Sequence, residues 1–404
     1  MARKRQPVLC VLDLGTARTR VLAAGVEDGR LQYLGYAAQP SQGMQKGAVV
    51  NLEAASQGIA LAVEAAERQA GLPIEEVTLS LTGPHMRCLQ SQAATSLAAR
   101  SREISPADVH AVLELARQVE LPEGYELLHI RPLEYILDRQ AGVREPAGLV
   151  ASRLEARVLL FSGASGPIQN RVSAANMAGL KVLELLFTPL AAADALLQAE
   201  EREQGVALVE IGAGCTGVLV AAQGGVQHAS VIGVGGDNFS RDVAIAFNTP
   251  QPAAEGMKHS FGQVLTAGMS ERAEIEAPGI GDRPIRMIRH REFCDHLRER
   301  AEELIHLIEE DLRRSGWLHR LGAGVVLAGG GAVLGGLAEL VEQQLRLPVR
   351  LGIPPLLEGM PGAFAAPEYA FLLGGALAAH RRLRRRQEQT GLWQRLWSRL
   401  ETTS

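Results

Sequence analysis

Cysteine and long apolar runs are both scarce in this 404-residue sequence. The four cysteines lie far apart, and none forms a CxxC pair: Cys10, Cys88, Cys215 and Cys294. This spacing excludes a disulfide framework or a cysteine zinc site, and it favours a reducing compartment. The uncharged run 323–338 is rich in glycine and too short to cross a bilayer as a helix.

The sequence also lacks an excess of positive charge and a secretory signal. The formal net charge is −4, which gives no general attraction to nucleic acid. The apolar run after Arg5 is interrupted by Asp13 too early for a signal peptide, so we expect a cytoplasmic protein. With 47% hydrophobic and 21% charged residues, the chain has the composition and length of a globular protein with two or more lobes.

The stretch 206–220, VALVEIGAGCTGVLV, reads as two buried strands around a glycine turn. Gly212, Gly214 and Gly217 permit unusual backbone angles and a close approach of a ligand. Such a turn can point several N–H groups at a phosphate, and Glu210 at its mouth could hold Mg²⁺ through water. A tight β-hairpin that needs glycine only for its geometry is an equally good interpretation of this stretch alone.

The same pattern occurs a second time at 8–21, VLCVLDLGTARTRV, with the carboxylate Asp13 before Gly15 and Thr16. Two such units indicate a duplicated domain with phosphates between the two turns. A third glycine segment, 327–336 (LAGGGAVLGG), follows a predicted strand and precedes a predicted helix. A nucleoside could lie against its backbone.

In this order, and with four further stretches, the sequence resembles the bacterial division actin FtsA, within the actin and heat-shock-chaperone ATPase superfamily. The stretches are PSQGMQKGAVVNLE, RPLEYILDRQAGVREPAGL, GVVLAGGGAVLGGL and GLWQRLWSRL. The resemblance implies an α/β, actin-like, duplicated two-lobed ATPase fold with a small α+β insertion (1C) and a C-terminal amphipathic helix. It also implies ATP and Mg²⁺ as cofactors. The implied nucleotide contacts are Asp13, Gly15, Thr16, Ala17, Arg18, Glu210, Gly212, Gly214, Cys215, Gly235, Gly236, Glu255, Lys258, Gly329, Gly330 and Gly331, with Asp13 and Glu210 as the magnesium residues.

The sequence departs from the resembled family at two of these positions and at Gly217. The family usually has aspartate at Glu210, threonine at Cys215 and a second aspartate at Gly217. Glutamate changes the reach to Mg²⁺, and a thiol is a poor hydrogen-bond donor to phosphate. We therefore expect ATP binding but at most slow hydrolysis, and no catalytic residue is assigned. A small residue that fills the turn is an equally good interpretation of Cys215.

The resemblance also divides the chain into segments. The first-lobe core (1A) covers 7–83 and 165–200, and subdomain 1C is inserted at 84–164. The second-lobe core (2A) covers 201–236 and 316–367, and its outer subdomain (2B) covers 237–315. The remaining segments are a return helix at 368–380, a basic and polar linker at 381–390 and an amphipathic helix at 391–404.

Local signals predict several elements. Asn51 is expected to cap a helix that ends before Gly71, and Ser105 a helix inside the insertion. Residues 189–204 read as one helix, and 292–314 as another. Glu255 and Lys258 lie one helical turn apart, which suits either a nucleoside contact or a surface salt bridge.

The outer subdomain carries a cluster of basic residues, Arg283, Arg286, Arg289 and Arg291. The resemblance implies that this subdomain binds the C-terminal tail of the tubulin-like FtsZ, although a solvated charged face explains the arginines equally well.

The C-terminal segment has an amphipathic pattern. On a helix, its large apolar side chains fall within an arc of about 140°: Leu392, Trp393, Leu396, Trp397 and Leu400. Arg395 and Arg399 flank this face, and residues 381–404 contain seven arginines and two glutamates. A helix this short needs a partner for its apolar face, which favours anionic lipid over the alternative of docking on the protein's own body.

We therefore expect an ATP-binding scaffold that tethers FtsZ filaments to the cytoplasmic face of the inner membrane at the division septum. Its expected partners are FtsZ, further copies of itself, anionic lipids and other division proteins, without nucleic acid. The alternatives are an actin-fold pilus-assembly protein and a small-molecule kinase or ATPase, neither of which needs the amphipathic tail to the same degree.

Overall fold

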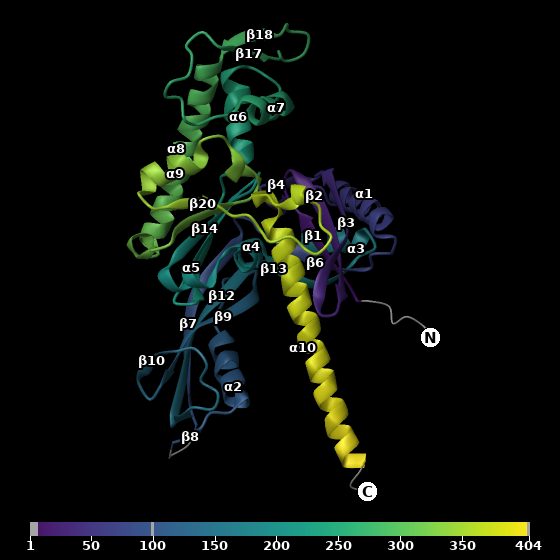
Figure 1. Cartoon of the computed structure of the whole chain (residues 1–404), viewed down its shortest axis with the longest axis vertical. Coiled ribbons are helices and arrows are strands. Elements are labelled where there is room, and N and C mark those ends of the chain that lie inside the picture. The colour runs from purple at the N-terminus through teal and green to yellow at the C-terminus, as the bar shows by residue number, and fades with distance from the viewer. Residues whose placement is uncertain (1–6, 98–100, 402–404) are drawn as a thin grey trace.

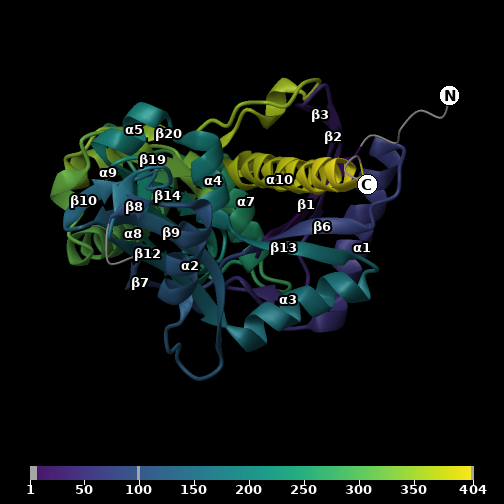
Figure 2. The same cartoon turned by 90° about the horizontal axis from the view of Figure 1, so that it is seen from below.

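The computed structural model describes residues 7–97 and 101–401, with side chains up to residue 385. Two five-stranded sheets form the centres of two lobes, and a smaller subdomain extends from each lobe (Figures 1 and 2).

The first sheet has the strand order β13-β6-β1-β2-β3. Its strands are β1 (Val8–Leu14), β2 (Arg18–Glu27), β3 (Arg30–Pro40), β6 (Glu76–Leu81) and β13 (Lys181–Phe187). Helices α1 (Leu52–Ala70) and α3 (Ser165–Met177) cover one face, where their buried side chains share a core with β1 and β6. As predicted, the Asn51 side chain caps α1 by accepting from the Ala54 N–H, and Gly71 ends it at φ 68°.

The second sheet has the order β16-β15-β14-β19-β20. Its strands are β14 (Val206–Ile211), β15 (Thr216–Ala222), β16 (Gly225–Ile232), β19 (Gly324–Ala328) and β20 (Val349–Leu351). In both sheets the first strand forms an antiparallel hairpin with the second and lies parallel to the fourth. This repeated topology confirms the predicted duplication, and it places the two hairpin turns at corresponding ends of their sheets.

The inserted subdomain is a four-stranded antiparallel sheet with one helix. Its sheet has the order β10-β9-β12-β7, with β7 (Met86–Ser96), β9 (Tyr125–Leu137), β10 (Gln140–Val143) and β12 (Arg153–Ala164). A two-stranded pair, β8 (Arg102–Glu103) and β11 (Val150–Ala151), lies at its tip, and α2 (Pro106–Arg117) packs against β7 and β12. The capping box between Ser105 and Asp108 starts α2 as predicted. The α+β insertion is thereby confirmed.

The outer part of the second lobe is helical. It contains α6 (Gly236–Ala246), α7 (Gln251–Phe261), the hairpin β17 (Glu274–Ala277) and β18 (Arg286–Arg289), and the long helix α8 (His290–Arg314). The apolar stripe of α8 is buried against α6 and the second sheet, from Phe293 to Leu312. α9 (Leu337–Leu345) covers the same core.

The prediction of one helix over 189–204 is wrong. The structure has two helices there, α4 (Thr188–Leu196) and α5 (Ala199–Gln204). Leu197 and Gln198 are extended between them, at ψ 126° and 159°. The Glu201 carboxylate accepts from the Gln198 N–H at 2.9 Å and pairs with Arg350 of β20 at 2.7 Å, which fixes a new helix start at this point.

Helix α10 (Ala370–Glu401) runs without a break through the segment predicted as a linker, 381–390. This difference has a simple cause, because the polar residues arginine, glutamine and glutamate are good helix formers, as is leucine. Gly374 allows close packing on α4: a Cβ there would lie 1.8 Å from the Ala191 carbonyl oxygen. The helix leaves the first lobe and points away from both lobes, on the side of the inserted subdomain (Figure 1).

Candidate functional site

The first hairpin turn follows Asp13 at the end of β1. The Gly15 N–H donates to the Arg18 carbonyl at 3.1 Å, and the Ser41 hydroxyl donates to the Gly15 carbonyl at 2.7 Å. A Cβ at Gly15 would lie 2.8 Å from the Arg18 oxygen, so only glycine allows this tight turn. Ala17 and Arg18 are exposed at its edge.

The second turn, between β14 and β15, lies against the first turn from the other lobe. Gly212 donates to the Cys215 carbonyl at 3.0 Å and closes it. A Cβ at Gly214 would lie 2.5 Å from the Thr16 hydroxyl oxygen and 2.8 Å from the Lys46 Cα. The structure thus brings together the two turns that the sequence pairs. Gly217, predicted in the turn, lies within β15 instead.

Cys215 is buried within this junction, with Sγ 3.9 Å from the Thr82 hydroxyl. Burial is the main cause that raises the pKa of its thiol, to about 11. Cys215 is therefore an uncharged thiol that packs inside the turn. At pH 7 it is not a thiolate nucleophile.

The glycine pair at the start of α6 packs directly on the second turn. Gly236 and Asp237 donate to the carbonyls of Gly212 and Ala213 at 2.9 and 2.8 Å. A Cβ at Gly235 would lie 2.6 Å from both of those carbonyl oxygens, so this position also requires glycine.

Glu255 and Lys258 of α7 belong to this part of the site. The Lys258 ammonium donates to the Gly236 carbonyl at 2.9 Å, to Ser240 Oγ at 2.9 Å and to Glu255 at 2.7 Å. Lys258 therefore connects α7 to the glycine pair at the start of α6. This contact is different from the surface salt bridge that was the alternative interpretation of Glu255 and Lys258.

The third glycine segment contains the 3₁₀ turn η2 (Gly330–Val333), after Gly329 at φ 81°. Cβ atoms at Gly329 and Gly331 would lie 2.4 Å from atoms of Ile211. At Gly330, by contrast, the nearest atom would be Glu368 Oε2, at 4.0 Å. The exposed face of Gly330 is therefore open space beside the cleft, whereas its neighbours are fixed by the second sheet.

Asp13 and Glu210 are both half-buried, and burial disfavours the charged form of each carboxyl group. Burial is the largest cause that raises the pKa of Glu210 to about 7, and the nearby Asp13 charge raises it further. Burial also raises the pKa of Asp13, against the opposing effects of Arg20, Ser80 and Arg171. Among the described residues no group of three or more His, Cys, Asp or Glu side chains is arranged to hold a metal. Two desolvated carboxylates still fit Mg²⁺, which keeps most of its waters and takes few protein ligands.

The pKa of Glu210 predicts a pH-dependent stability. Its folded pKa of about 7 exceeds the ordinary 4.5, so the native state binds more protons between these values and stability falls as pH rises from about 4.5 to 7. We expect thermal unfolding of Glu210→Gln, scanned from pH 5 to 8, to show a smaller fall in Tm than wild type. Equal slopes in the two proteins would contradict the raised pKa.

Arg171 is a buried residue behind the first turn that the sequence patterns did not single out. It is completely buried, and its guanidinium donates to the Gly47 carbonyl at 2.9 Å and to the Ser80 carbonyl at 2.8 Å. Burial lowers its pKa to about 10, so it remains a cation at neutral pH. The sequence does contain a signal for this residue. Arg171 lies three residues from both Ile168 and Ala174, which places it on the buried face of α3. Arg20, which pairs with Glu368 beside Gly330 at 3.0 Å, was also missed.

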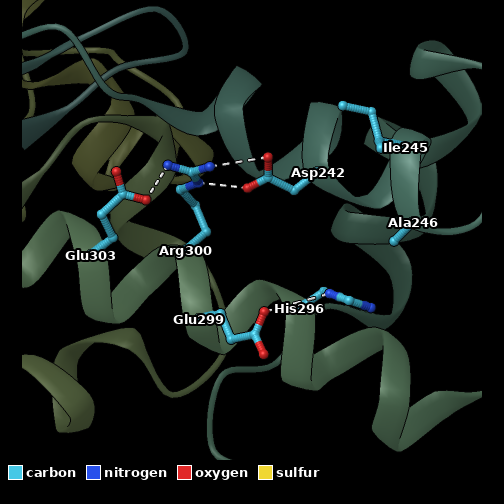
Figure 3. Close-up of a pocket in the computed structure, with 7 residues that line it drawn as sticks. All are labelled: Asp242, Ile245, Ala246, His296, Glu299, Arg300 and Glu303. Carbon is cyan, nitrogen blue, oxygen red and sulfur yellow. Dashed lines mark hydrogen bonds and ion pairs between the residues drawn. The ribbon is translucent and has the colours of Figure 1, made fainter.

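The four arginines of the outer subdomain lie on and around the β17–β18 hairpin. Arg291 pairs with Glu271, Arg289 with Glu292 at 3.5 Å, and the exposed Arg286 donates to the Phe247 carbonyl at the end of α6. Beside Phe247, an open groove of about 380 Å³ lies between α6 and α8 (Figure 3). Arg300 lies between Asp242 and Glu303 in this groove, and His296 and Glu299 complete it below Ile245 and Ala246.

The predicted membrane residues lie beyond the described side chains, and this part of the chain is placed only as the last turns of α10. They are Leu392, Trp393, Arg395, Leu396, Trp397, Arg399 and Leu400. No helix in the described part of the chain is long and apolar enough to cross a membrane.

Two family models match the chain, "Cell division protein FtsA" at residues 207–374 and "SHS2 domain inserted in FTSA" at residues 83–162. The cell division protein FtsA of Pseudomonas aeruginosa is 36% identical over 364 residues, which cover 90% of this chain and 87% of that protein. FtsA of Escherichia coli K12 is 33% identical over 371 residues, covering 90% and 88%.

Solved structures of lower identity show the same fold. A PilM–PilN type IV pilus biogenesis complex matches with a TM-score of 0.67 at 18% identity, covering 92% of this chain and 98% of that chain. MreB5 of Spiroplasma citri bound to ADP matches with a TM-score of 0.54 at 14% identity, covering 94% and 98%. These structural similarities establish the actin-like fold. The relatives of higher sequence identity show to which family of that fold the chain belongs. The chain belongs to the FtsA family of cell division proteins.

Proposed function

We propose that this protein is an ATP-binding division scaffold that binds the C-terminal tail of FtsZ and tethers FtsZ filaments to the cytoplasmic membrane at the septum. Other division proteins are recruited through the same scaffold, and copies of it associate side by side. The observation that carries the proposal is the similarity to FtsA proteins over nine-tenths of the chain.

The nucleotide part of the proposal is supported by the convergence of three glycine segments on the cleft between the lobes. The turns at Gly15 and Gly214 meet there, and Gly330 offers an open backbone surface at one side. The related fold of MreB5 has been solved with ADP and with AMPPNP. When bound, Mg²⁺ would neutralise phosphate charge, and the Asp13 and Glu210 carboxylates would hold its water ligands.

The membrane part rests on the sequence of the tail and on the direction of α10. Arg381 and Arg382 pair with Asp194 and Glu184 of the first lobe, which anchors the base of the helix. Arg384 and Arg385 remain exposed next to them and would face an anionic surface.

The FtsZ part is supported by the continuity of the basic hairpin and the groove. Arg286 donates to the Phe247 carbonyl, and the Phe247 ring packs edge-on against His296 of the groove, with ring centroids 5.4 Å apart. Ile245, Ile285 and Met287 expose apolar surface around them. An acidic peptide with apolar side chains suits the hairpin side of this surface, where it would meet the arginines, Ile285 and Met287, away from the carboxylates that line the groove.

Charge reversal at Arg286 and Arg289 is expected to weaken binding of an FtsZ C-terminal peptide about five- to thirty-fold, since two attractive contacts become repulsive. Fluorescence anisotropy with a labelled peptide measures this. The control is the same double reversal at Arg313 and Arg314, which are exposed at the far end of α8. If the Arg286/Arg289 variant has native circular dichroism and unchanged affinity, the FtsZ peptide binds at another surface.

Co-sedimentation tests the tethering as a whole. FtsZ should pellet with anionic liposomes only when this protein is present, and the effect should disappear when residues 391–404 are deleted. If FtsZ stays in the supernatant in the presence of the full chain, the tethering proposal fails.

A further inference from the structure

The hairpin of β4 (Met44–Gln45) and β5 (Ala48–Val49) has an unusual residue in its turn. Gln45 pairs with Ala48, so Lys46 and Gly47 are the two central residues, and both have positive φ, 46° and 74°. Two-residue turns of this kind favour asparagine or glycine at the first position. A lysine there is strained, and strained residues concentrate at functional sites.

The cleft itself holds this turn in place. The Gly47 N–H donates to the Thr16 hydroxyl at 3.0 Å, and the Gly47 carbonyl accepts from the buried Arg171. On the opposite side, the Lys46 backbone packs on Gly214 of the second lobe. Lys46 therefore lies where both candidate phosphate turns meet.

The cations around the cleft differ in what they contact. Arg20 pairs with Glu368, Arg171 donates to backbone carbonyls, and Lys258 is bonded to Glu255. Within the described residues, the exposed Lys46 side chain makes no hydrogen bond or ion pair, and the same is true of Arg18 in the first turn and of Arg241 in α6. Lys46 differs from Arg18 because its backbone touches the turns of both lobes.

We propose that Lys46 is a specificity-determining residue that binds the terminal phosphate of a nucleoside triphosphate and so distinguishes ATP from ADP. This inference rests on the proposed nucleotide binding. The ammonium supplies a charge-assisted hydrogen bond to the third phosphate, a group that ADP lacks. The strain at φ 46° is retained because glycine or asparagine at this position would lack the charge.

Affinities for Mg·ATP and Mg·ADP test the proposal in the full-length protein. In Lys46→Met and Lys46→Gly, ATP affinity should fall about tenfold while ADP affinity changes less than about threefold. Lys46→Arg should restore most of the preference, and Gln45→Met serves as the control on the same hairpin. The Tm of Lys46→Gly should not fall, because glycine relieves the strained turn.

A second measurement uses the rarity of lysine, since the chain has only Lys4, Lys46, Lys181 and Lys258. Reductive ¹³C-methylation keeps the lysine charge and gives each lysine an NMR signal. The Lys46 signal is identified by its absence from the spectrum of Lys46→Arg. It should shift when Mg·ATP is added and much less when Mg·ADP is added. The exposed Lys181 signal should stay in place.

The outcomes separate the two proposals. If wild type binds ATP and ADP but the Lys46 variants keep the same ATP-to-ADP ratio and the signal does not move, the role of Lys46 is wrong and nucleotide binding stands. If wild type binds neither nucleotide, both proposals are wrong.

Discussion

Replacing Trp397 by glutamate should release the protein from anionic liposomes, with a fall of about 10- to 100-fold in the partition coefficient. Burying a large apolar side chain contributes roughly 1.5–3 kcal/mol, and each factor of ten corresponds to about 1.4 kcal/mol. The substitution removes one of five apolar side chains and places a charge on the same face. Flotation with vesicles of defined anionic content measures the effect. Because one short helix binds weakly, the loss should be larger for assembled protein.

The control for this experiment is Ser398→Glu, which adds the same charge near the centre of the polar face of the helix. It should remain bound at low salt, and its binding should weaken with rising salt in parallel with wild type. ATP affinity should be unchanged in both variants, since the end of α10 lies far from β1, β2 and β14, which carry the glycine turns (Figure 1). If Trp397→Glu floats as well as wild type, the tail is not the anchor, and docking on the protein's own body becomes the better interpretation.

Replacing Gly330 by valine should lower ATP affinity at least about tenfold and leave the fold intact. The fold is expected to be preserved because the nearest atom to a Cβ at Gly330 would be Glu368 Oε2, at 4.0 Å, and Gly330 is exposed. The affinity falls because the same side chain would occupy the open surface against which we expect the nucleoside to lie. Isothermal titration with Mg·ATP measures the affinity, and circular dichroism with Tm verifies folding.

The glycines of the chain provide their own controls for the Gly330 experiment. Gly166→Val also enters open space at an ordinary φ, but at the start of α3, and should leave ATP affinity unchanged. Gly331→Val would collide with Ile211 and should lower Tm. Full ATP affinity in folded Gly330→Val protein would contradict the placement of the nucleoside at this turn.

The two hairpins and their helices could be predicted because their signals are local. Apolar runs around Gly15 and Gly214 indicate strand-turn-strand units, and Asn51 and Ser105 are capping residues within one turn of the helices they start. The duplicated pattern was enough to predict two lobes. The end of α10 was harder, because the arginine-rich segment 381–390 is polar like a linker but also composed of helix formers.

The glycine turns, the carboxylates Asp13 and Glu210 beside them, and the amphipathic pattern at the C-terminus follow from the amino-acid sequence, since each depends on residues that are neighbours in the chain. Which distant residues complete the site depends on the tertiary fold. Arg171 reaches Gly47 across 124 positions of the chain, and Lys46 meets Gly214 from the other lobe. The first contact arises from the packing of α3 on β5 and the second from the meeting of the two hairpin turns, and no local pattern specifies either. Burial beside Asp13 also raises the pKa of Glu210, and the sequence alone does not show this.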